Sequence, residues 1–113
     1  MNVNYDEIFR IFEYEGFKIY VVDIRALICV THDKKSKIFI DTNFWKSLSR
    51  DERKALISHE LEELKLINKG LSWWKAHLIA TSKDNFEVRK RIIWKCHATN
   101  MRKLGLKLKM RIK

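Results

Sequence analysis

The residues with the clearest chemical potential lie in the segment His59-Glu60-Leu61-Glu62-Glu63. Zinc accepts imidazole nitrogens and carboxylate oxygens as ligands, and residues four positions apart lie on the same face of a helix. His59 and Glu63 can therefore bind one metal ion, with Glu60 beside it as the base for a metal-activated water. The pattern follows the logic of a His-Glu-x-x-His helix in which glutamate replaces the final histidine.

The helical position of Glu60 distinguishes it from an ordinary surface acid. At about 100° per residue, the apolar residues of 53–67 fall on one stripe. They are Leu56, Ile57, Leu61, Leu64 and Ile67. Glu60 falls inside this stripe, whereas Glu62 points outward. A buried carboxylate without a partner costs about 2 kcal/mol or more, so Glu60 is expected to pair with a cation, to face a cleft or to belong to a metal site.

His77 is the candidate for a third ligand, because a catalytic zinc site needs three protein ligands and a water. It lies in the segment Trp73–Ala80, which is expected to form the next helix. Gly70 allows that helix to fold back on its predecessor, and the small residues Ala76 and Ala80 allow a close approach. Two imidazoles and one carboxylate suit zinc.

The same residues also have simpler interpretations. The acidic helix can be an ordinary charged surface, and His77 an ordinary half-buried histidine. Cys96 and His97 are neighbours in a predicted helix and so point apart, which argues against a shared metal. His32 is interpreted as a polar loop residue, and the four tryptophans as core or cleft walls.

The elements that position these residues predict an α+β fold. We expect an N-terminal helix over residues 5–15, ended by Gly16, and then a small, mainly antiparallel three-stranded sheet. Its strands are expected at residues 17–23, 25–31 and 37–41, with a turn at 32–36.

Three helices are expected to follow the sheet. Ser49 and Glu52 form a capping box for a helix that ends near Lys69, and Ser72 caps a helix to about Thr81. A second capping box at 84–87 opens a helix to about Leu104. Residues 106–113 alternate apolar and basic side chains, which predicts an extended tail that seeks a sheet edge or a groove.

Composition predicts a single domain over residues 1–113. The chain is 46% hydrophobic, contains no proline and has three glycines, so we expect short loops and long helices. Cys29 and Cys96 lack metal-type spacing, which favours reduced thiols in a cytoplasm. There is no apolar run long enough for a membrane span and no signal-peptide pattern, so neither membrane insertion nor export is expected.

The charge distribution supports a competing function. Residues 83–113 hold eleven Lys or Arg residues against two acids, a net of +9, whereas the first 82 residues carry a net of +1. Such a basic arm favours nucleic acid or another acidic partner. The alternative to an enzyme is therefore a small nucleic-acid-binding protein without catalysis. A third possibility is a structural-metal or metal-free interaction protein.

The order of strands, the His59–Glu63 helix and the Ala76-His77 helix resembles the minigluzincins from about residue 17 to the end. These are very small soluble zinc metallopeptidases of thermophilic prokaryotes, similar to catalytic domains of certain membrane-integrated peptidases. The resemblance implies zinc as cofactor, Glu60 as general base and His59, Glu63 and His77 as ligands. The wider gluzincin group has a second histidine where this chain has Glu63.

The resemblance also suggests latency, with a core at residues 1–85 blocked by the C-terminal helix and tail at 86–113. A peptide substrate is expected along an edge strand at 37–41, and the alternating tail has the pattern needed to occupy that edge instead. Deleting residues 105–113 is then expected to raise activity. Exchange of the helix at 86–104 with a second copy would make a swapped homodimer.

Overall fold

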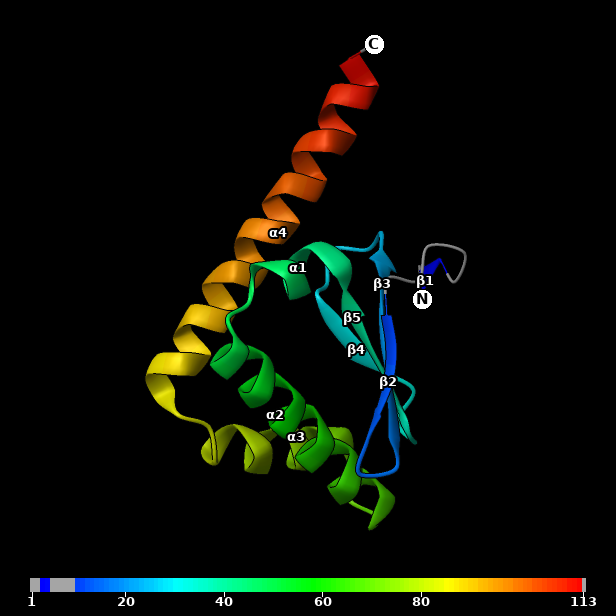
Figure 1. Ribbon diagram of the computed structural model, residues 1–113, viewed down its shortest axis with the longest axis vertical. Coiled ribbons are helices and arrows are strands. Elements are labelled where there is room, and N and C mark those ends of the chain that lie inside the picture. Colours follow the sequence, from blue (N-terminus) through cyan, green and yellow to red (C-terminus); the bar gives the residue numbers. More distant parts are fainter. Residues whose placement is uncertain (1–2, 5–9, 113) are drawn as a thin grey trace.

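The computed structural model describes residues 3–4 and 10–112, which form a mixed β-sheet with helices packed on one face (Figure 1). The strands are β1 (Val3–Asn4), β2 (Arg10–Tyr14), β3 (Phe17–Ile24), β4 (Val30–His32) and β5 (Lys37–Asp41). The helices are α1 (Thr42–Ser47), α2 (Arg50–Asn68), α3 (Trp73–Ser82) and α4 (Phe86–Ile112). The α+β class is as predicted, but the arrangement of the sheet and three of the predicted elements are not. These are the N-terminal helix, the extended tail and the strand at 25–31, of which only residues 30–31 are strand, within β4.

The predicted N-terminal helix is wrong where the structure describes it. Residues 10–14 form β2, which pairs antiparallel with β3, while residues 5–9 lie outside the described residues. Glu15 and Gly16 have φ values of 50° and 83°, the positive values that a two-residue hairpin turn requires. Phe12 packs against the core and its neighbour Ile11 is exposed, which is the alternation of a strand.

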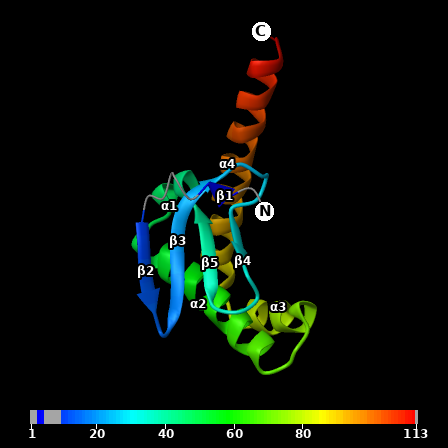
Figure 2. The ribbon, with the colours of Figure 1, turned by 90° about the vertical axis from the view of Figure 1, so that its right-hand side faces the viewer.

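The predicted antiparallel meander is also wrong, because β3 and β5 are parallel neighbours. After Ile24 the chain crosses over and returns as the short strand β4, which pairs antiparallel with the far side of β5. Figure 2 shows the resulting order β2-β3-β5-β4, and β1 pairs with the end of β3. The edge strand nearest α2 and α3, the helices that carry the candidate residues, is therefore β4. The predicted edge strand at 37–41 is a central strand of the sheet.

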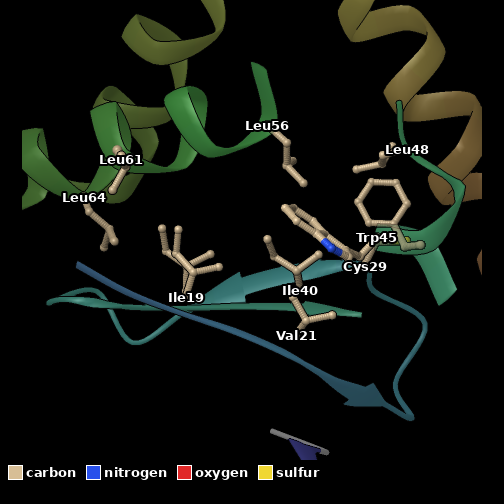
Figure 3. Packing of buried hydrophobic residues seen from close by; sticks show 11 residues of the cluster. Ile19, Val21, Cys29, Ile40, Trp45, Leu48, Leu56, Leu61 and Leu64 are labelled. Atoms are coloured by element: carbon tan, nitrogen blue, oxygen red, sulfur yellow. The ribbon is translucent and has the colours of Figure 1, made fainter. Parts of the chain in front are cut away.

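The core lies between the sheet and α1 and α2. Alternate residues of β3 and β5 point toward the helices, where they meet the apolar stripe of α2 (Figure 3). The central members are Ile19, Val21, Ile38, Ile40, Leu56, Leu61 and Leu64. Trp45 of α1 closes one end of this cluster beside Phe12. The packing fixes the rotation of α2 about its axis, and with it the direction of every polar side chain on that helix.

Local signals determine where the site helices begin. Ser49 and Glu52 form both halves of the predicted capping box at the start of α2, and Ser72 caps α3. Gly70 has a φ of 102° between the two helices, a left-handed conformation that glycine adopts without strain. Ala76 and Ala80 are buried where α3 folds back on α2, as predicted.

Helix α4 begins where predicted but is longer than expected. The residue that caps it is Asn85, whose Oδ1 accepts a hydrogen bond from the Val88 N–H at 3.1 Å, and not Asp84. The prediction of an extended tail is wrong, because α4 continues through Gly105 to Ile112 and runs away from the body (Figure 1). Most residues of the tail are strong helix formers, and a single interior glycine costs only about 1 kcal/mol.

Cys29 and Cys96 form a disulfide with a Cα–Cα distance of 5.8 Å, so the prediction of reduced thiols is wrong in this structure. The two cysteines are 67 residues apart in the chain, and their proximity depends on the packing of α4 beside the loop before β4. The bridge ties α4 to that loop. Among the described helices, none combines the length and the apolarity that crossing a bilayer requires.

Candidate functional site

His59 and Glu63 meet on the face of α2 that the sequence predicted. Both side chains are buried, and His59 Nε2 lies 3.1 Å from Glu63 Oε2. The neighbouring Glu62 points outward and binds Lys83 at the surface. The one-turn spacing therefore does bring an imidazole and a carboxylate together.

Helix α3 brings His77 to the same carboxylate oxygen. His77 Nδ1 lies 3.1 Å from Glu63 Oε2, and the rings of His59 and His77 have centroids 5.5 Å apart. Trp73, one turn earlier on α3, stacks on the His77 ring at 5.1 Å and limits its rotation. All three predicted ligands thus converge on one point, with ligand atoms within 4.8 Å of one another.

Glu60 lies beside this group without a hydrogen bond or ion pair to any of the residues that the structure describes. Its carboxylate is half-buried, and its ligand oxygen lies within 4.8 Å of ligand atoms of His32 and Glu63. Burial, and then the charge of Glu63, raise the pKa of Glu60 to about 7. A carboxyl group with that pKa can both accept and release a proton near neutral pH.

Asp84 and Arg89 extend the site on the side of α4, and the sequence analysis did not assign them to it. Asp84 Oδ2 lies 2.9 Å from His59 Nδ1 and 2.9 Å from Arg89 Nη1. The Asp84 carboxylate accepts the hydrogen of Nδ1, which leaves Nε2 of His59 toward Glu63 and His77. Asp84 was interpreted as a helix cap, but Asn85 takes that role and leaves the Asp84 carboxylate for His59.

His32 is a third residue that the sequence analysis did not assign to the site. It was interpreted as a loop residue, but it ends β4 with its side chain only 6% exposed, and its Nε2 lies 2.9 Å from Glu63 Oε1. The turn that follows β4 gave no sign that α2 would pack beneath it. His97 is an exposed residue next to Trp94, and Cys96 is in the disulfide and lines the cavity beside His59 and His77.

The electrostatics of the cluster are dominated by Glu63. Burial opposes its negative charge, but hydrogen bonds from His32, His59 and His77 outweigh burial and lower the pKa of Glu63. Burial likewise opposes a charge on His59, yet Glu63, Glu60 and Asp84 together raise its pKa. A buried carboxylate that stays ionised among imidazoles is an environment suited to a cation.

Two cavities of about 350 Å³ each meet at Glu60 and His77. The first runs between the loop before β4 and α4, and its walls are mainly apolar, with Leu27, Ile92 and Ile93 among them. The lining of the second cavity is less apolar, and this cavity opens along β4 past Trp73. Glu60 is therefore accessible both from the cavity beside the edge strand β4 and from the apolar cavity beside α4.

The donor set fits a single zinc ion. Two imidazole nitrogens and one carboxylate oxygen can occupy three positions of a tetrahedron, and the fourth remains for water or substrate. Among the described residues, the possible ligand atoms of His32, His59 and His77 do not all lie within 4.8 Å of one another. His59, Glu63 and His77 thus form one group of three possible ligands, and His32, Glu60 and Glu63 form a second group that shares Glu63. Comparisons of the chain with protein-family models, with curated proteins and with solved structures each found no match.

Proposed function

We propose that the protein is a zinc-dependent metallopeptidase similar to the minigluzincins, with peptide or protein substrates. The observation that carries the proposal is the position of Glu60, a half-buried carboxylate without a partner among the described residues, next to the converging donors of His59, Glu63 and His77. Zinc in such a site polarises a peptide carbonyl and lowers the pKa of a water molecule. The side chains of the protein supply the remaining functions.

Glu60 is the general base. Its carboxylate would take a proton from water and deliver it to the departing amine. Asp84 orients His59 by accepting its Nδ1 hydrogen, and Arg89 in turn holds Asp84. These two residues keep the lone pair of His59 Nε2 directed at the metal position.

The substrate is expected to bind as an added strand along β4. Within the described part of the chain, β4 is at the edge of the sheet, and its residues line the cavity that leads to Glu60. Backbone groups of an edge strand can pair with an extended peptide. The adjoining apolar cavity would then receive an apolar side chain next to the cleaved bond.

The nucleic-acid alternative is less well supported, because the body of the molecule uses part of the basic arm. Arg89 binds Asp84, Arg91 and Lys95 bind Glu52, and Lys103 Nζ lies 3.4 Å from Asp41 and donates to two backbone carbonyls. These cations stabilise the docking of α4. Nucleic-acid binding without catalysis therefore has charge in its favour but no identified interface.

The test compares zinc content and peptide hydrolysis in wild-type protein and three variants. His59→Ala should lose zinc and activity, whereas Glu60→Gln should keep zinc and lose activity by about 10²–10⁴-fold, the usual contribution of a general base. Glu62→Gln is the matched control on the outer face of α2 and should change neither. Hydrolysis that is as fast in Glu60→Gln as in wild type would contradict the proposal.

A further inference from the structure

His32 approaches Glu63 from the sheet, opposite to the two helical histidines. His59 and His77 both contact Oε2 of Glu63, whereas His32 Nε2 lies 2.9 Å from Oε1. The two oxygens of one carboxylate therefore have different partners. One faces the imidazoles that can bind a metal, and the other faces β4.

The turn after β4 determines which nitrogen of His32 carries hydrogen. The backbone N–H of Lys34 donates to His32 Nδ1 at 3.1 Å, so Nδ1 is an acceptor and has no hydrogen. In the neutral ring the hydrogen is then on Nε2, which donates it to Glu63 Oε1. With Nδ1 engaged by the backbone and Nε2 carrying hydrogen, the ring has no lone pair left for a metal.

The turn itself is tightly held. Oδ1 of Asp33 accepts hydrogen bonds from the backbone N–H groups of Lys35, Ser36 and Lys37, at 2.8, 2.9 and 3.0 Å. Within the turn, Lys34 has a φ of 63°, a conformation that a side-chain-bearing residue adopts at some cost. A short strand end and a rigid turn thus fix the direction of one imidazole.

We propose that His32 is a positioning residue that makes Glu63 a one-oxygen ligand. This inference rests on the proposed zinc site. By holding Oε1, the Nε2–H group of His32 leaves Oε2 alone to face the metal position, so the carboxylate does not take a second coordination position. The same hydrogen bond draws negative charge away from Oε2, which brings the glutamate closer to the neutral histidine that a His-Glu-x-x-His helix has there.

Two amide variants of His32 test this role. In His32→Gln the side-chain amide nitrogen reaches about the position of Nε2 and can still donate to Glu63. In His32→Asn the same amide is one methylene shorter and falls short of Oε1. The pair therefore has matched chemistry and polarity and differs in reach. Thermal melting of both metal-free variants verifies that each is folded.

The measurements are zinc affinity, by competition with a chromophoric chelator, and the visible spectrum of the Co²⁺-substituted protein. His32→Asn should bind zinc about 10–100-fold more weakly, the usual effect of removing a partner of a ligand, and His32→Gln should stay within a few-fold of wild type. In His32→Asn the freed Oε1 raises the coordination number, so the cobalt absorption should weaken. His32→Gln should keep the wild-type spectrum.

Two results would overturn the inference. If His32→Asn matches wild type in zinc affinity and cobalt spectrum, the hydrogen bond does not control Glu63. If both variants lose metal as completely as His59→Ala, His32 is itself a ligand. Wild-type protein that binds neither ion contradicts the proposed zinc site, which is a different failure from either of these.

Discussion

Glu52 anchors α4 to α2. Its replacement tests how α4, which lines the apolar cavity of the site, is held against the body. The Glu52 carboxylate is 2% exposed, accepts a hydrogen bond from the Ser49 N–H at 2.8 Å, and binds Arg91 and Lys95 of α4. Burial opposes its charge, but the Lys95, Ser49 and Arg91 contacts prevail and lower its pKa from 4.5 to about 2. Glu52→Gln keeps the capping acceptor and removes the charge.

The size of the effect follows from the pKa. At about 1.4 kcal/mol per pH unit, a fall from 4.5 to about 2 corresponds to about 3–4 kcal/mol. Lys95 and Arg91 are 36% and 54% exposed, so solvent screens part of this. We expect Glu52→Gln to lower the free energy of unfolding at pH 7 by about 1–2 kcal/mol, or the midpoint temperature by roughly 4–10 °C.

The pH dependence has a definite sign. The pKa of Glu52 is lower in the folded state, so its contribution is complete above pH 4.5 and is lost as the pH falls toward 2. Urea unfolding of wild type and Glu52→Gln should therefore differ most at pH 6–7 and converge as the solution is acidified. Glu62→Gln, which removes the exposed pair with Lys83, is the control and should cost less than about 1 kcal/mol. A Glu52→Gln effect that is equal at all pH values, or no larger than the control, refutes the reasoning.

Two further predictions concern the surroundings of the site. Asp84→Asn should weaken zinc binding about 10–100-fold by removing the charged partner of His59, as measured by chelator competition, while Asp51→Asn at the exposed start of α2 should have no effect; equal affinities in both variants would exclude the orienting role. Deleting residues 105–113 should leave zinc affinity and hydrolysis unchanged, because this part of α4 runs away from the body (Figure 1); a rise in activity on truncation would support a latent precursor after all.

Sequence reasoning was sufficient for the parts of the site that local signals determine. The capping box at Ser49 and the apolar stripe of α2 placed His59, Glu60 and Glu63 correctly on the helix, and the left-handed turn at Gly70 made the approach of His77 foreseeable. In each case, neighbours within a few residues set the geometry. The predicted roles of these residues in zinc binding and catalysis stay predictions.

The wrong predictions concern features that depend on contacts between residues far apart in the sequence. His32 reaches Glu63 only because β4 crosses to the far side of β5, and the pairing of Cys29 with Cys96 depends on the docking of α4. The capping residue of α4 was also predicted wrongly. Asp84 and Asn85 are both good helix caps, and their order in the sequence does not show which one is used. The alternating tail is helical because most of its residues favour helix, and it runs away from the sheet as the end of α4 (Figure 1).

The central claim is most directly tested by metal analysis of the purified protein. After exhaustive dialysis against a chelator and reconstitution with zinc, elemental analysis should find one zinc ion per chain in wild type and in Glu60→Gln, and none in His59→Ala or His77→Ala. Zinc that is absent from wild type, or that remains in both histidine variants, would contradict the account.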